Sequence, residues 1–123
     1  MDIASRKDGM ALLVSVSGEL DLHTAREFRA RVDADYDRFG ARDMVFDFAR
    51  VSFVDSSGLG AILGRYSRAA EKGGQVALAG PQPHVRRLLE LAGVMRIIHT
   101  YADVEEALRA MGAKEAAAGG DKR

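Results

Sequence analysis

Cysteine is absent from this 123-residue sequence. The chain therefore has no disulfide framework, no thiol nucleophile and no cysteine-ligated metal site, and a reducing compartment is expected. An excess of either charge is also missing, because 18 lysines and arginines balance 18 aspartates and glutamates. A net charge of zero gives no overall field to hold nucleic acid or an anionic membrane, so neither is expected as a partner.

Long apolar runs are missing as well. The first eight residues lack the apolar core of a signal peptide, and no stretch reaches the length that crosses a membrane. We therefore expect a soluble, cytoplasmic protein. With 47% hydrophobic residues, the chain is long enough to enclose one core in one domain.

What is present is an alternation of two apolar periodicities. Strand patterns occur at 2–6, 10–17, 43–48, 75–79 and, more weakly, 97–98. Helical spacing predicts four helices that begin near Thr24, Ser57, Val85 and Asp103 and end at Gly40, Gly73, Gly93 and Gly112. Thr24 and Glu27 have the spacing of a reciprocal capping box, and Asp103 is expected to cap the last helix.

Strands that alternate with helices predict an α/β fold. We expect a single mixed β-sheet of four to five strands with about four α-helices packed against it, joined by right-handed crossovers. No repeat or linker divides the chain. The folded domain is expected over 1–112, and the polar segment 113–123, which has nothing to bury, is expected to be a flexible C-terminal tail.

The most informative segment is Phe53-Val54-Asp55-Ser56-Ser57-Gly58-Leu59-Gly60. It follows a predicted strand and opens a predicted helix, so two hydroxyls lie where a helix N-terminus exposes unpaired backbone N–H groups. Such a position favours negative charge. From the residues alone, the two serines are either ordinary helix caps or one of them carries a phosphate.

Enzymatic uses of this segment fail on spacing. Gly58, Gly60 and Gly64 form G-x-G-x-x-x-G, whereas a dinucleotide-binding turn needs G-x-G-x-x-G and an acidic residue about 20 positions later, which is absent here. A P-loop needs a G-K-[ST] ending, which the chain lacks. A serine hydrolase elbow needs G-x-S-x-G, which is also absent.

Histidines and cations elsewhere give weak signals. The histidines are scattered over separate elements without metal-ligand spacing, at His23, His84 and His99. We therefore expect no metal, no cofactor and no catalysis. The predicted helices also carry cations that could form a basic partner surface, although a solvated helix surface explains most such runs: Arg65, Arg68, Lys72, Arg86 and Arg87.

Carboxylates give a second, conditional signal near the segment. Glu19 and Asp21 follow the second predicted strand, and Asp55 follows the third. If these two strands are neighbours, all three carboxylates end at the sheet edge that carries Ser56. For Asp21 or Asp55 alone, capping a turn is the simpler explanation.

Three segments together closely resemble the anti-anti-sigma factors of the STAS domain family: Gly18-Glu19-Leu20-Asp21, Ser52 to Gly60, and Ile62-Leu63-Gly64-Arg65-Tyr66. The resemblance extends from about Ile3 to Met111 and identifies residues 1–112 as a STAS domain. It implies the STAS fold and a regulatory binding module without catalysis of its own.

The resemblance also implies partners and a switch. Such antagonists bind an anti-sigma factor that is a serine kinase, displace the sigma factor, and are phosphorylated on the first serine of the pair, here Ser56. A dedicated phosphatase removes the phosphate. The residues expected to contact the kinase are Asp21, Asp55, Ser56, Ser57, Gly58, Leu59 and Gly60, with Ser57 mainly structural and the glycines clearing a path for the partner.

One alternative stays open at the same place. A STAS module can instead sense a ligand, binding a nucleotide or small anion at this helix N-terminus. The phosphorylatable serine after Asp55 favours the antagonist, and a monomer is the expected free state. Sporulation control is the expected setting, and the identity of the sigma factor stays open because sporulation and stress-response antagonists share this motif.

Overall fold

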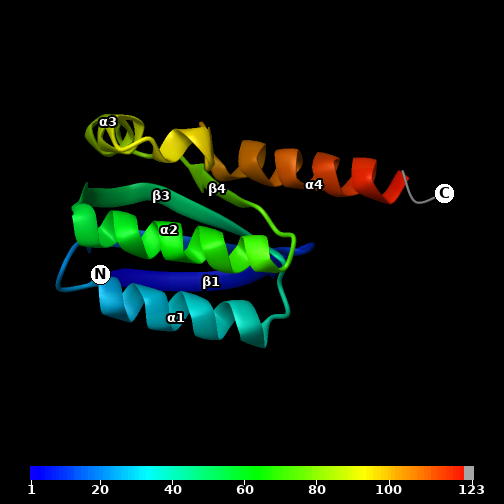
Figure 1. Ribbon diagram of the computed structural model, residues 1–123, viewed down its shortest axis with the longest axis horizontal. Coiled ribbons are helices and arrows are strands. Elements are labelled where there is room, and N and C mark those ends of the chain that lie inside the picture. Colours follow the sequence, from blue (N-terminus) through cyan, green and yellow to red (C-terminus); the bar gives the residue numbers. More distant parts are fainter. Residues whose placement is uncertain (121–123) are drawn as a thin grey trace.

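The computed structural model describes residues 1–120, with side chains described over 1–112 (Figure 1). The order of elements is β1 (Asp2–Asp8), β2 (Ala11–Leu20), α1 (Ala25–Arg38), β3 (Asp43–Val54), α2 (Ser56–Glu71), β4 (Val76–Ala79), α3 (Pro83–Leu91), a 3-10 turn η1 (Val94–Arg96), β5 (His99–Tyr101) and α4 (Val104–Gly120). The predicted alternation of strands and helices is confirmed.

The five strands form one mixed sheet in the order β1-β2-β3-β4-β5. A tight turn at Gly9, with φ of 60°, joins β1 to β2 as an antiparallel hairpin. The pairs β2–β3, β3–β4 and β4–β5 are parallel, each joined by a crossover through a helix. The expected single mixed sheet with about four helices is confirmed.

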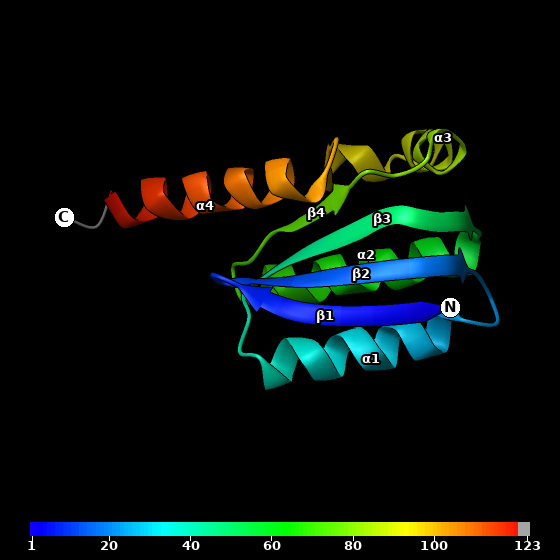
Figure 2. The ribbon, with the colours of Figure 1, turned by 180° about the vertical axis from the view of Figure 1, so that it is seen from behind.

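The two faces of the sheet are covered unequally. Helices α1, α2 and α3 pack on one face, where alternate strand residues such as Leu12, Val14 and Phe46 join Phe28 and Ile62 in the main core. On the other face α4, which runs beside β4 in Figure 2, packs on a smaller cluster. The buried members of this cluster are Ala11, Leu13, Val45, Ala77, Ala79, Ala107 and Met111. The strand period of two thus separates two apolar layers.

Several predicted boundaries are wrong. The strands predicted at 10–17 and 43–48 continue to Leu20 and Val54, because their parallel pairing extends to these residues. The last strand is His99–Tyr101 and not Ile97-Ile98, because the 3-10 turn that begins after Gly93 buries Ile98 in the main core and leaves Ile97 exposed. Helix α4 continues past Gly112 to Gly120. The prediction of a flexible tail over 113–123 falls in part on 121–123, which lie outside the described residues.

The predicted cap of the last helix is confirmed. The Asp103 carboxylate accepts a hydrogen bond from the backbone N–H of Glu106 at 2.8 Å. Among the helices described over residues 1–120, none has the length and apolar character needed to span a bilayer.

Candidate functional site

The candidate site lies at the carboxyl-terminal edge of β2 and β3. These strands are parallel neighbours, and their register pairs Glu19 with Phe53 and Leu20 with Val54. Asp21 and Asp55, the residues that follow the two strands, therefore lie side by side at the edge of the sheet. The carboxylates were expected at the edge that carries Ser56 if these two strands were neighbours, and the two strands are neighbours.

Asp55 is the cap of α2 and also ties it to the neighbouring loop. Its Oδ1 accepts a hydrogen bond from the backbone N–H of Gly58 at 3.0 Å. Its Oδ2 accepts one from the backbone N–H of Leu22, also at 3.0 Å. The helix begins at Ser56, one residue earlier than predicted, and the cap is the aspartate and neither serine.

These hydrogen bonds stabilise the charged form of Asp55. The bond from Gly58, followed by the one from Leu22, holds the pKa of the Asp55 carboxyl below its usual range. The helix N-terminus is thus already occupied by a side-chain anion. A free anionic ligand at this position would have to displace or repel that carboxylate, which weakens the ligand-sensing alternative.

Asp21 organises the loop between β2 and α1. Its Oδ1 accepts hydrogen bonds from the backbone N–H groups of His23, at 2.9 Å, and Thr24, at 3.2 Å. The Thr24 hydroxyl donates to the backbone oxygen of Glu19 at 2.7 Å and accepts from the N–H of Asp21 at 2.9 Å. The predicted capping box between Thr24 and Glu27 is wrong, because loop partners occupy the hydroxyl.

The two serines have different surroundings. Ser56 is exposed at the first position of α2, whereas Ser57 is half-buried in the same turn. Leu59 is partly buried and packs against the main core. Only the first serine therefore presents its side chain openly to a partner at this edge.

The two glycines of the segment also differ. Gly58 is buried, and a methyl group there would overlap the carbonyl oxygen of Leu20 and lie 3.0 Å from Cγ1 of Val54. Gly60 is exposed, and a methyl group there would meet open space. The expectation that both glycines clear a path for a partner is wrong for Gly58, which permits the close approach of α2 to the end of β2.

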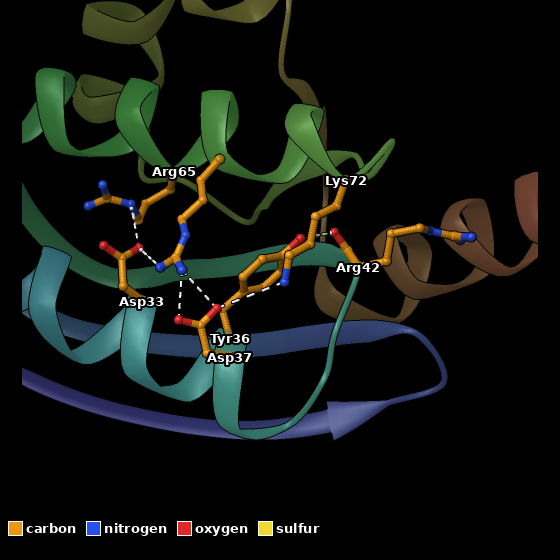
Figure 3. Close-up of polar contacts among 7 residues, drawn as sticks. Asp33, Tyr36, Asp37, Arg42, Arg65 and Lys72 are labelled. Atoms are coloured by element: carbon orange, nitrogen blue, oxygen red, sulfur yellow. Dashed lines mark hydrogen bonds and ion pairs between the residues drawn. The ribbon is translucent and has the colours of Figure 1, made fainter.

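The suggested basic surface on α2 is largely engaged within the fold (Figure 3). Arg65 Nε lies 3.0 Å from Asp33 Oδ1 of α1, and Arg68 Nη1 lies 3.0 Å from the same oxygen. Arg68 Nη2 and Lys72 Nζ reach Asp37 at 2.6 and 3.8 Å. These cations join α2 to α1, so they do not form a free partner surface.

The cations on α3 and the histidines stay apart from this contact. Arg86 pairs with Glu90 at 3.2 Å within α3, and Arg87 is exposed. His84 Nε2 lies 2.6 Å from the backbone oxygen of Ser52, which ties α3 to the end of β3. Among the described residues, no three His, Asp or Glu side chains gather as metal ligands do.

Two exposed apolar residues at the site were missed. Leu22 is 70% exposed in the β2–α1 loop, and Phe53 is 47% exposed near the end of β3. A signal was present in the sequence, because Leu22 stands between Asp21 and His23 in a polar turn where a buried role is not expected.

The family model of the STAS domain matches residues 2–107. The chain belongs to the STAS domain family. Its mixed five-stranded sheet with four helices is therefore the fold of a STAS domain.

Two relatives of this STAS domain are named as anti-sigma factor antagonists. It is 40% identical over 97 residues to the anti-sigma F factor antagonist of Paenibacillus polymyxa, a match that covers 79% of this chain and 83% of the relative. It is 29% identical over 92 residues to the anti-sigma-B factor antagonist of Staphylococcus aureus, covering 75% and 84% of the two chains.

A solved structure has the same fold. The Bacillus cell fate determinant SpoIIAA in its phosphorylated form superposes with a TM-score of 0.69 at 26% identity, covering 89% of this chain and 98% of that one. The predicted STAS fold and the resemblance to anti-sigma factor antagonists are confirmed.

Proposed function

We propose that this STAS domain is an anti-sigma factor antagonist. In its unphosphorylated form it binds an anti-sigma factor that is a serine kinase, and the sigma factor is released. Phosphorylation of Ser56 ends this binding, and a phosphoserine phosphatase acting on Ser56 restores it. The observation that carries the proposal is the exposure of Ser56 at the first position of α2, directly after Asp55.

Sporulation control is the proposed setting. It is supported by the 40% identity to an anti-sigma F factor antagonist, against 29% for the anti-sigma-B antagonist. The protein acts in the cytoplasm, as a monomer when free, without a cofactor, nucleic acid or membrane. The residues proposed to form the kinase-binding site are Asp21, Asp55, Ser56, Ser57, Gly58, Leu59 and Gly60.

The exposure of these residues separates those that contact the kinase directly from those that position the site. Ser56 and Gly60 face outward and meet the kinase directly. Asp21, Asp55 and Gly58 act mainly from within, because their hydrogen bonds and packing fix the loop and the first turn of α2. The target serine is thereby presented on a rigid edge, which lowers the entropic cost of entering the kinase active site.

The switch follows from charge. A phosphate adds about 1.5 to 2 negative charges at neutral pH. At Ser56 it would stand next to Asp55, whose carboxylate already accepts the N–H of Gly58, and on the edge that carries Asp21. Desolvating this group in an interface is unfavourable, and a loss of ~3 kcal/mol lowers affinity roughly a hundredfold.

The free protein tolerates the same phosphate. The Ser56 residue is exposed, so modification displaces no core residue and the phosphate stays in contact with water, which screens it from the Asp55 carboxylate. The phosphorylated domain is therefore expected to stay folded while its binding fails.

The test uses the purified kinase, ATP and two variants. Ser56→Ala is expected to bind the kinase about as tightly as the wild type without accepting phosphate, whereas Ser56→Asp is expected to bind at least about tenfold more weakly. Calorimetric titration gives the affinities, and mass spectrometry locates the phosphate.

Ser57→Ala is the matched control. It should still be phosphorylated, because the modified hydroxyl is the one on the neighbouring residue. Phosphate found on Ser57, or equal affinities for Ser56→Ala and Ser56→Asp, would contradict the proposal.

A further inference from the structure

Two large apolar residues near the Asp55 cap of α2 are exposed. Leu22 is 70% exposed, and its backbone N–H donates to Asp55 Oδ2 at 3.0 Å. Phe53 is 47% exposed and precedes Asp55 by two residues on β3. Because Val54 faces the main core under α2, the Phe53 side chain lies on the opposite face of the sheet. Leu22 and Phe53 are thus both close to the sheet edge where the proposed kinase contact occurs, one in the loop bonded to Asp55 and one near the end of β3.

The Leu22 loop is held in one conformation. Its ends are fixed by the bond from Leu22 N–H to Asp55, by the two backbone N–H groups that donate to Asp21 Oδ1, and by the Thr24 hydroxyl bound to the oxygen of Glu19. An apolar side chain on a fixed loop loses little further freedom on binding. Leu22 thus combines exposure with preorganisation.

Phe53 is held in a similar way. Its neighbour across the sheet is Glu19 of β2, and the backbone oxygen of Ser52 beside it contacts His84 Nε2 at 2.6 Å. These contacts hold the backbone of Phe53, and exposed aromatic side chains on a rigid backbone are typical anchors of protein interfaces.

We infer that Leu22 and Phe53 form an apolar docking patch for the anti-sigma factor kinase, next to Ser56. This inference rests on the proposed function. The patch is bordered by the carboxylates of Glu19 and Asp21, so the kinase surface that covers it is apolar at its centre and basic at its rim.

The kinase is a better occupant than a second copy of this chain. A homodimer through this edge would cover Ser56 and bring the Glu19, Asp21 and Asp55 carboxylates of both copies together. The kinase must reach Ser56 from the same side, so its contact surface continues onto the patch. A phosphate placed beside the patch would then oppose its desolvation.

The experiment measures kinase binding and phosphorylation by Leu22→Ala and Phe53→Ala. Each substitution is expected to raise the Kd of the unphosphorylated protein about tenfold, because a largely buried apolar side chain is lost from the interface. In steady-state phosphorylation, KM should rise by a similar factor while kcat at saturation stays close to wild type, since Ser56 itself is unchanged.

Ile97→Ala is the matched control. Ile97 is 45% exposed, close to the value for Phe53, but it lines a hollow with Gly74 and Gln75 at the opposite ends of the parallel strands. Its Kd should stay within about twofold of wild type. Leu22→Met, which keeps an apolar side chain, should bind better than Leu22→Ala, and thermal unfolding of every variant checks that the fold is kept.

The outcomes separate the two proposals. If wild type binds the kinase and is phosphorylated on Ser56 while Leu22→Ala and Phe53→Ala bind equally well, the docking patch is wrong and the antagonist function stands. A patch that affects only self-association, measured by analytical ultracentrifugation, also overturns the inference. If the wild type neither binds the kinase nor is phosphorylated, the proposed function is wrong, and the docking patch that rests on it is wrong as well.

Discussion

At the scale of single residues, the glycines of α2 show how one residue type serves two purposes. Gly58 is buried against the Leu20 carbonyl, and Gly60, two positions on, is exposed to open space. The helix can approach the end of β2 only because Gly58 lacks a side chain, whereas Gly60 lies where a partner would approach. Both positions are glycines near the start of the same helix, but only Gly58 is packed against another element.

The two glycines give opposite predictions for stability. Gly58→Ala should lower the free energy of unfolding by about 2 kcal/mol, because its methyl group overlaps backbone that cannot move freely. Gly60→Ala should raise it by up to about 1 kcal/mol, because alanine favours a helix interior. Urea unfolding followed by circular dichroism measures both, and equal effects of the two substitutions would rule out this assignment.

At the scale of elements, α1 and α2 are joined by an apolar contact with ion pairs beside it. Arg65 is only 8% exposed, and burial lowers the pKa of its guanidinium while the charge of Asp33 raises it. Arg68 bridges Asp33 and Asp37, and Lys72 lies 4.6 Å from the ring centre of Tyr36. A buried cation needs its counter-charge more than an exposed one does.

This difference predicts unequal effects of two matched substitutions. Asp33→Asn should destabilise the fold by roughly 2 kcal/mol, because the buried Arg65 loses its charged partner. This loss is smaller than the loss expected for breaking a fully buried ion pair, because Asp33 itself is partly exposed. Asp37→Asn, at a side chain that is 52% exposed, should cost less than about 1 kcal/mol. Chemical unfolding at low and high salt measures both values. A larger effect at Asp37 would contradict this account of the helix contact.

At the scale of the whole molecule, stability depends on covering both faces of the sheet. Three helices cover the main core, and α4 alone covers Leu13, Val45 and Ala77 on the other face, through Ala107 and Met111. Among the side chains described over 1–112, those of α4 that contact this cluster lie before Gly112. The composition of 113–123 gives no reason for a further contribution to the core.

Two truncations test this division. A chain ending after Gly112 should unfold with nearly the wild-type free energy, within about 0.5 kcal/mol, because it keeps every described residue of the cluster under α4. A chain ending after Ala102 should lose cooperative unfolding or aggregate, because an apolar face of the sheet is uncovered. Urea unfolding and light scattering distinguish the two. A large loss on removing only 113–123 would place part of the core in that segment.

Local sequence determined the order of elements, the mixed sheet, the Asp103 cap and the position of Ser56 at a strand-to-helix turn. These features depend on periodicity and on neighbours within a few residues, which a sequence displays directly. The resemblance to the STAS domain family rested on the same local motifs and supplied the regulatory reading of Ser56.

Only the tertiary structure decided how the site is built. The bond between Asp55 and Leu22 joins residues 33 positions apart, and the contact of Gly58 with Leu20 and the pairing of Arg65 with Asp33 also join separate elements. Such contacts depend on strand register and helix packing, which no local pattern specifies. For the same reason only the structure shows that Asp55, and neither serine, caps α2, and that Leu22 and Phe53 are exposed near this cap.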